Sequence, residues 1–410
     1  MSSVSRRSLL TGIGALGVGA VGVGGLVAAD AAGSAAPTAP APQIVPFRGQ
    51  RQAGIVTQQQ DRLTFAAFDV VTRNRSELVE LLRTWTAAAE SMTRGQQVPG
   101  GASQLQAPPA DTGEAAGLKP GNLTVTIGFG PSLFDDRFGL AAKRPALLRP
   151  LPKLPPEDLD PHYTGGDLCV QACADDPQVT FHVIRNLARL GAGTVVLRWM
   201  QLGFGRTAST SSAQATQRNL MGFKDGTRNL RAEQAELIDQ HVWVGAETDQ
   251  PWLRGGSYLV ARRIRMFIET WDRDYLGDQQ NVFGRYKGSG APLTGVSEFD
   301  TPDFAARDAE GGLVIPEDAH VRLAAPEHNN GTRLLRRGYS FTDGIDPTGN
   351  LLGGLFFIAF MRSPEQFISV QRKLGESDAL NEYIQHIGGG LFACPPGVGA
   401  GQHWGQSLFA

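Results

Sequence analysis

The chain has 410 residues, of which 41% are hydrophobic and 19% charged, and its formal net charge is −2. A single hydrophobic core seldom grows beyond about 250–300 residues, so we expect two domains. The nearly balanced charge lacks the basic excess that nucleic-acid binding needs, and no nucleic acid is expected as a partner.

Residues 1–48 are expected to precede the folded part. Arg6 and Arg7 stand before an apolar, glycine-rich run that extends to about Ala29 and leads into small residues. This order is typical of a cleavable export signal, and the paired arginines resemble a twin-arginine signal. A transmembrane anchor is the alternative, but such a glycine-rich run makes a poor membrane helix, which needs about 20 strongly apolar residues. We therefore expect an exported protein, extracellular or in the cell envelope or periplasm. It should have no stable membrane span after processing, and residues 33–48 should form a disordered Ala/Pro-rich tether.

The sequence contains 3 cysteines, Cys169, Cys173 and Cys394. So small and odd a number does not make a disulfide framework in an exported chain. On a strand, Cys169 and Cys173 share one face, and a bridge along a single strand is disfavoured. Packing in the core is the preferred interpretation.

Hydrophobic periodicity and helix-start signals predict six elements in the first half of the chain. In order they are strand, helix, strand, strand, helix and strand, over residues 63–71, 76–92, 123–127, 167–174, 177–190 and 194–204. This is the split βαβ order of a ferredoxin-like domain.

A second copy of this order is predicted after residue 235. It begins with a long strand (256–271), a helical stretch (272–283) and an irregular insert (284–333). Two paired strands (334–341 and 354–361), a helix (364–374) with an extension (378–386) and a short strand (389–393) follow. We therefore predict two related α+β domains, 49–235 and 236–410, whose long inserts can wall a pocket.

One segment, Gly-Phe-Lys-Asp-Gly-Thr-Arg-Asn at residues 222–229, places a single carboxylate between two glycines. Gly222 and Gly226 permit backbone shapes and close approaches that other residues do not. On this pattern alone, Asp225 can equally be a solvated residue in a surface turn.

Among the 7 histidines, His320 stands out as a candidate metal ligand. It lies among small and apolar residues, and Arg322, two positions on, can meet an anionic group. His328 lies in a polar context and is interpreted as a loop residue, next in line as a ligand. The other histidines are expected to pack in the core or face solvent.

Arginines cluster in Arg-Leu-Leu-Arg-Arg-Gly-Tyr-Ser-Phe at residues 333–341. Strand alternation puts Arg336 and Arg337 on opposite faces. One guanidinium can point inward while the other is solvated; alternatively, both are charges that protect an edge strand.

The segments around Asp225 (222–229), His320 (319–324) and Arg336 (333–341), in this order, resemble the signature segments of the dye-decolorizing peroxidases. The Gly-Phe-Lys-Asp-Gly-Thr-Arg-Asn form resembles the twin-arginine-exported deferrochelatase/peroxidase subgroup. The resemblance extends from about residue 50 to the C-terminus. Two departures are Arg51, where His is expected before Gln-Ala-Gly, and Leu230, where Pro is usual.

The resemblance implies haem b between the sheet and the helices of the C-terminal domain. The haem is expected to be non-covalent, since no Cys-x-x-Cys-His occurs. In the family pattern His320 is the metal ligand, and Arg322, Gly226 and Thr227 lie against the cofactor. Asp225 and Arg336 fall on the catalytic positions of the opposite face.

The implied chemistry is reduction of hydrogen peroxide at the expense of an organic reductant. Asp225 is expected to move a proton between the two peroxide oxygens, and Arg336 to stabilise negative charge as the O–O bond breaks. Because an unperturbed aspartate has a pKa of about 3.9, the optimum should lie near about pH 4 to 5. Bulky dyes cannot reach a buried iron, so a surface aromatic residue can relay electrons. The tryptophans considered, each also readable as core, are Trp199, Trp243, Trp252 and Trp271.

Two further functions remain open on the sequence. The first is an exported haem-binding deferrochelatase that releases iron from haem, with iron-uptake components as partners. The second is an α+β binding protein without catalysis. Sheets of this type often associate, so a homo-oligomer is compatible with the sequence, which does not establish one.

Overall fold

The computed structural model describes residues 44–100 and 105–410. The predicted export signal, and the tether up to residue 43, lie outside the described residues. The folded part begins before the predicted boundary at residue 48. Phe47 packs against Trp404 with ring centroids 5.3 Å apart, and Arg48 pairs with Glu90. Among the described residues, no helix has the length and apolar character to cross a membrane.

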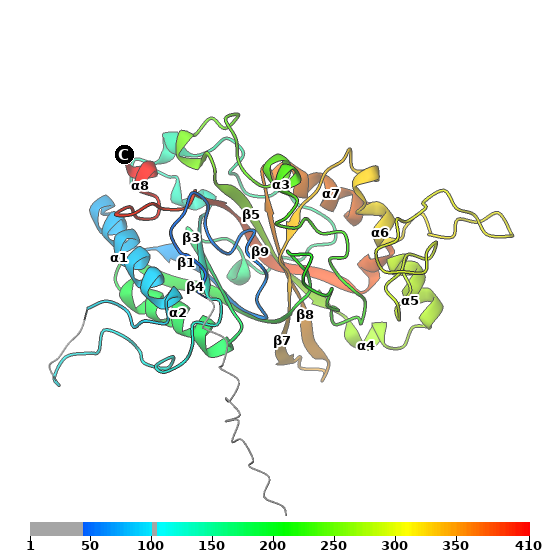
Figure 1. Ribbon diagram of the computed structural model, residues 1–410, viewed down its shortest axis with the longest axis horizontal. Helices are drawn as coiled ribbons and strands as arrows, with labels where there is room; N and C mark the ends of the chain where they lie inside the picture. The colour runs from blue at the N-terminus through cyan, green and yellow to red at the C-terminus, as the bar shows by residue number, and fades with distance from the viewer. Residues whose placement is uncertain (1–43, 101–104) are drawn as a thin grey trace, which may run out of the picture. The chain divides into compact units, whose positions relative to one another are not determined.

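The first half of the chain has the predicted order of elements (Figure 1). They are β1 (Arg62–Val70), α1 (Arg75–Thr93), β2 (Thr124–Phe129), β3 (Leu168–Ala174), α2 (Pro177–Leu190) and β4 (Val195–Arg206). Helix α2 starts as expected, with Asp176 as N-cap and Pro177 at its first position. The N-cap of helix α1 is Asn74, whose side chain accepts a hydrogen bond from the Ser76 amide at 2.9 Å.

The second half repeats this order around a longer insert. Its elements are α3 (Ala235–His241), β5 (Ser257–Met266), α4 (Ile268–Trp271), α5 (Leu276–Phe283), α6 (His320–Leu323), β6 (Leu335–Arg336), β7 (Tyr339–Ile345), β8 (Leu351–Met361), α7 (Pro364–Ser377), β9 (Ile384–Cys394) and α8 (Gln406–Phe409). The predicted helical extension over 378–386 is wrong. Helix α7 ends at Ser377, Asp378 caps a short 3-10 turn, and β9 begins at Ile384 so that it pairs along the whole of β5.

The strands of the described residues join in one continuous sheet. It consists of two four-stranded antiparallel halves with the same order, called the first and second sheets below. The first sheet runs β2-β3-β1-β4 and the second β7-β8-β5-β9. The short strand β6 pairs with the same edge of β8 as β7 does. In each sheet the order is second, third, first and fourth strand, which is the ferredoxin-like arrangement. The sheets meet where β2 pairs with β9 and where β4 pairs with β7, so the strands close into a ring.

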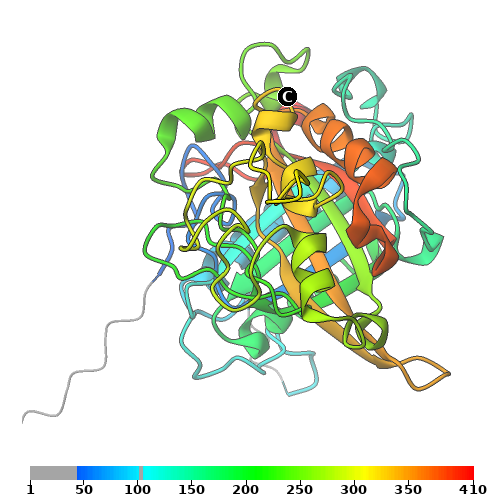
Figure 2. The ribbon, with the colours of Figure 1, turned by 90° about the vertical axis from the view of Figure 1, so that its right-hand side faces the viewer.

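Each half buries its strands in a different way. Helices α1 and α2 cover the N-terminal strands, and the rings of Phe68 and Trp85 meet there at 5.1 Å. Between the two sheets, Phe65 packs against Trp199 and Phe356, each at 5.2 Å. Helices α5, α6 and α7 lie at the opposite end from α1 and α2, and Figure 2 looks onto that end.

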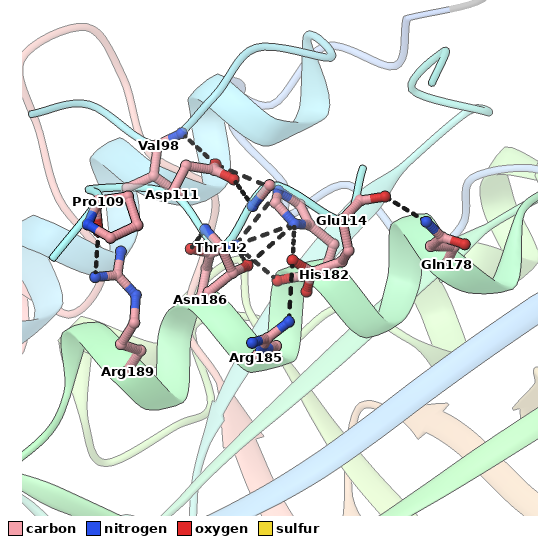
Figure 3. Close-up of polar contacts among 11 residues, drawn as sticks. Val98, Pro109, Asp111, Thr112, Glu114, Gln178, His182, Arg185, Asn186 and Arg189 are labelled. Carbon is pink, nitrogen blue, oxygen red and sulfur yellow. Dashed lines mark hydrogen bonds and ion pairs between the residues drawn. The ribbon is translucent and has the colours of Figure 1, made fainter. Parts of the chain in front are cut away.

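His182 is buried, and it anchors the loop between α1 and β2 to helix α2 (Figure 3). Its side chain is 7% exposed and lies between two carboxylates. Its Nε2 is 3.4 Å from Asp111 and its Nδ1 is 3.4 Å from Glu114. Asp111 in turn accepts hydrogen bonds from the amides of Val98 and Gly113. The cluster therefore fixes a loop to a helix away from the chemistry described below.

Replacing His182 with Ala is expected to lower the free energy of unfolding by about 1–3 kcal/mol, because two largely buried carboxylates lose the group between them. Denaturant unfolding of the variant and of His162→Ala, which alters an exposed histidine, measures the difference. Affinity for the haem that the sequence leads us to expect should not change in either variant. Equal stabilities would show that the loop is held by other contacts.

Candidate active site

One cavity of about 240 Å³ lies between the second sheet and helix α7. Ile264 of β5 and Phe357 of β8 line it from the sheet, and Phe367 and Val370 line it from the helix. The loop 219–228 and helix α6 contribute charged and imidazole side chains. A cavity whose surface is mainly apolar but which also presents charged groups suits a largely hydrophobic ligand that carries charged substituents.

Asp225 and Arg336 meet at this cavity, although they are far apart in the chain. The Arg336 Nη1 lies 2.7 Å from the Asp225 Oδ1. Asp225 is presented by a tight turn in which its amide donates to the Gln217 carbonyl at 3.1 Å and Gly226 has φ +92°. A Cβ at position 226 would lie 2.8 Å from the Cα of Ala208, so this position requires glycine.

Asn229, the last residue of the Asp225 segment, fixes Arg336 in place. Its Oδ1 accepts from the Arg336 amide at 2.8 Å, and its Nδ2 donates to the Arg336 carbonyl at 2.9 Å. The paired bonds join the loop to strand β6. Asn229 is part of the motif recognised in the sequence, but its bonds to the Arg336 backbone could not be predicted because the two residues are far apart in the chain.

Arg336 and Arg337 face opposite sides, as alternation predicts, but Arg337 is not solvated. It is 0% exposed. Its guanidinium donates to the Thr57 carbonyl and to the Gln60 Oε1. The far side of β6 is the core between the sheets rather than solvent, so neither arginine acts as a protective edge charge.

His320, at the start of α6, also lines the cavity. Its Nδ1 lies 2.6 Å from the Asp378 Oδ2, and the Asp378 Oδ1 accepts from the Leu380 amide at 2.9 Å. When Nδ1 donates its proton to this carboxylate, a neutral His320 has Nε2 available as a ligand. Burial lowers the pKa of His320, but the Asp378 charge and hydrogen bond outweigh it and leave the pKa raised. The sequence did not identify Asp378.

Two of the other predicted residues, Gly226 and Thr227, line the cavity, whereas Arg322 does not. The Arg322 guanidinium donates to the carbonyls of Phe304 at 2.6 Å and Ile315 at 2.7 Å. Positively charged side chains that do line the cavity are Lys224, Arg228, Arg285, Arg333 and Arg336. Any carboxylates of a ligand would therefore find their partners among these rather than at Arg322.

Replacing Arg322 with Ala should leave the affinity for the haem expected from the sequence unchanged. It should lower the free energy of unfolding by about 1–3 kcal/mol, through loss of its bonds to backbone carbonyls. Arg333→Ala, at the cavity, should weaken haem binding about ten-fold through loss of a charged partner. Haem titration followed by absorbance, with denaturant unfolding, separates the two effects. Weakened binding in Arg322→Ala would restore the role expected from the sequence.

His328 is exposed and its ring meets that of Phe304 at 5.0 Å, away from the cavity lining. His386 does line the cavity, and burial, with Arg262 nearby, lowers its pKa to about 3. Each of the four tryptophans considered as surface relays is buried: Trp199, Trp243, Trp252 and Trp271. The three cysteines are free and buried, as expected.

Comparison with known proteins places this arrangement in a family. The profile described as Dyp-type peroxidase, N-terminal, matches residues 52–205, and the profile described as Dyp-type peroxidase, C-terminal, matches residues 216–399. Together they span both sheets, the Asp225 loop and His320.

Individual relatives agree over most of their length. A deferrochelatase from Yersinia pseudotuberculosis is 40% identical over 88% of this chain and 84% of its own, and one from Escherichia coli O6:K15:H31 is 39% identical over 98% and 96%. The oxyferrous/water structure of DtpA from Streptomyces lividans superposes with a TM-score of 0.83 at 38% identity, over 90% of this chain and 98% of that one. A DyP-type peroxidase from Streptomyces coelicolor gives 0.83 at 39% identity, over 90% and 97%. This chain therefore belongs to the dye-decolorizing (DyP-type) peroxidase family of haem enzymes.

Proposed function

We propose that the protein reduces hydrogen peroxide with haem b held in the cavity by His320, and that Asp225 and Arg336 act on the peroxide from the opposite face. The residues present suit haem. The walls are apolar, cationic side chains can meet propionates, and the hydrogen bond to Asp378 leaves the Nε2 of His320 to bind iron. Gly226 and Thr227 would lie against the cofactor.

Bound haem supplies the redox chemistry, taking oxidising equivalents from peroxide and passing them to a reductant. The residues of the chain handle protons and charge. Asp225 accepts a proton from one peroxide oxygen and returns it to the other. The Arg336 guanidinium stabilises negative charge as the O–O bond breaks. Asp378 fixes the tautomer of His320 and strengthens it as an electron donor.

The observation that carries this proposal is the convergence of two polar pairs, Arg336–Asp225 and His320–Asp378, on one apolar cavity. The test is the absorption spectrum of the haem-loaded protein before and after one equivalent of peroxide at about pH 5, within the acid range expected for a carboxylate base. The Soret band should change with peroxide and return when a dye is added. Haem that binds without a response to peroxide would contradict the proposal.

A second function is supported by the names of the relatives, since proteins 38–40% identical over most of the chain are called deferrochelatases. In that function the same cavity holds haem as a substrate and iron leaves it, with iron-uptake components as partners. Incubation with haem under reducing conditions distinguishes the two. Metal-free porphyrin with free iron would support iron release, whereas intact haem after peroxide turnover would support the peroxidase.

We further propose that the protein is exported by the twin-arginine route. The support is the Arg6-Arg7 pair before an apolar run in the sequence. Replacing both arginines with lysine should retain the protein in the cytoplasm, as measured by cell fractionation. Unchanged export would contradict the assignment.

A further inference from the structure

The first part of the 284–333 insert packs along the loop that carries Asp225. Arg218 donates to the carbonyls of Lys287 at 2.6 Å and Gly288 at 2.7 Å. Gly290 lies so close that a Cβ there would be 2.7 Å from the Cδ of Lys224. The position of the loop thus depends on a segment some 60–75 residues further along the chain.

Glu298 is the carboxylate at this contact. Its Oε2 pairs with the Lys224 Nζ, and its Oε1 accepts from the Thr227 Oγ1 at 3.1 Å. Lys224 immediately precedes Asp225, and Thr227 follows Gly226. A single carboxylate therefore holds the turn on both sides of Asp225. The Glu298 side chain is 10% exposed and is not part of the cavity lining.

Glu298 also contributes a negative charge at this contact. Burial raises its pKa, but hydrogen bonds from Lys224, Thr216 and Thr227 outweigh burial, so that the net shift is downward and the group is ionised. Its negative charge balances Lys224, which lines the cavity beside Asp225. Without it, Lys224 would be an uncompensated cation able to compete with Arg336 for the Asp225 carboxylate.

We propose that Glu298 is a positioning residue for the peroxide step: it holds Lys224 and Thr227 so that the Asp225 carboxylate stays directed at Arg336 and the cavity. This inference rests on the proposed role of Asp225. Glu298 itself touches neither the cavity nor the reacting atoms.

The test uses Glu298→Gln in the haem-loaded, full-length protein. The rate of the peroxide-induced Soret change should fall about ten-fold or more, because a catalytic group loses its support. Haem affinity, and the rate at which dye restores the resting spectrum, should be unchanged. Hydrogen exchange should quicken in peptides covering 216–229. Glu247→Gln, which removes a carboxylate paired with Arg362 at the surface, is the matched control and should change none of these.

The double variant Asp225→Asn/Glu298→Gln separates positioning from an independent effect. If Glu298 acts through Asp225, the double variant should be no slower than Asp225→Asn alone. The inference would be overturned if adding Glu298→Gln to Asp225→Asn slowed the peroxide reaction by the same factor as Glu298→Gln does alone. It would also be overturned if Glu298→Gln reacted at the parent rate while Asp225→Asn was slow. An unchanged rate in Asp225→Asn would instead overturn the proposed function. If Glu298→Gln does not fold, Lys224→Met/Glu298→Gln removes both charges and allows the same comparison.

Discussion

Replacing Asp225 with Asn is expected to slow the reaction with peroxide about 10²- to 10³-fold while haem remains bound. The amide keeps nearly the same shape but cannot carry a proton from one peroxide oxygen to the other. It also removes the negative partner that lies 2.7 Å from the Arg336 guanidinium. Because His320 and Asp378 are untouched, haem affinity and the resting spectrum should be close to those of the parent protein.

Stopped-flow absorbance at the Soret band measures this step directly. Asp272→Asn is the control, since Asp272 is exposed and lies outside the cavity lining; it should react at the parent rate. The rate at which dye restores the resting spectrum is recorded separately in the same proteins, and Asp272→Asn should leave it at the parent value. Parent-like peroxide kinetics in Asp225→Asn would remove Asp225 from the mechanism.

Local signals were enough to predict most of the fold. The strand and helix order of the first half follows from alternating apolar residues and from the Asp176-Pro177 helix start, and the structure confirms it. The end of the chain was different. The predicted helical extension over 378–386 includes residues 384–386, but pairing with β5 draws these into β9. Strand pairing is a tertiary interaction and overrides local preference.

The site shows the same limit more clearly. The sequence motifs predicted that Asp225, His320 and Arg336 belong to the site. The direction of the Arg322 side chain, however, depends on the helical conformation of α6. On α6, two residues correspond to a rotation of about 200°, so Arg322 points away from the cavity that His320 faces. Similarly, strand alternation predicts that Arg337 faces the opposite side from Arg336. That side is buried rather than exposed to solvent because the two sheets close into a ring around it. Asp378 and Glu298 reach the site through contacts across the fold, for which no local pattern exists.

Replacing His320 with Ala is expected to weaken haem binding about 100-fold or more. Loss of a residue that only hydrogen-bonds to a metal ligand can weaken metal binding by about 100-fold, and here the ligand itself is removed. The protein should lose its stable Soret band on gel filtration. His328→Ala is the matched control, because His328 is exposed and outside the cavity lining, and it should bind haem normally. Haem retained by His320→Ala but lost by His328→Ala would move the ligand to His328.

A loss of haem in His320→Ala can also come from damage to the site, since the Asp378 side chain is 2% exposed and would be left without its imidazole partner. An unpaired buried carboxylate costs about 1–3 kcal/mol. His320→Gly with added imidazole resolves this ambiguity. Free imidazole can occupy the vacated volume, donate one N–H to Asp378 and offer its other nitrogen to iron. Recovery of the Soret band with imidazole would show that the variant lacks only the ligand; failure to recover in a folded protein would mean that His320 does not hold the haem.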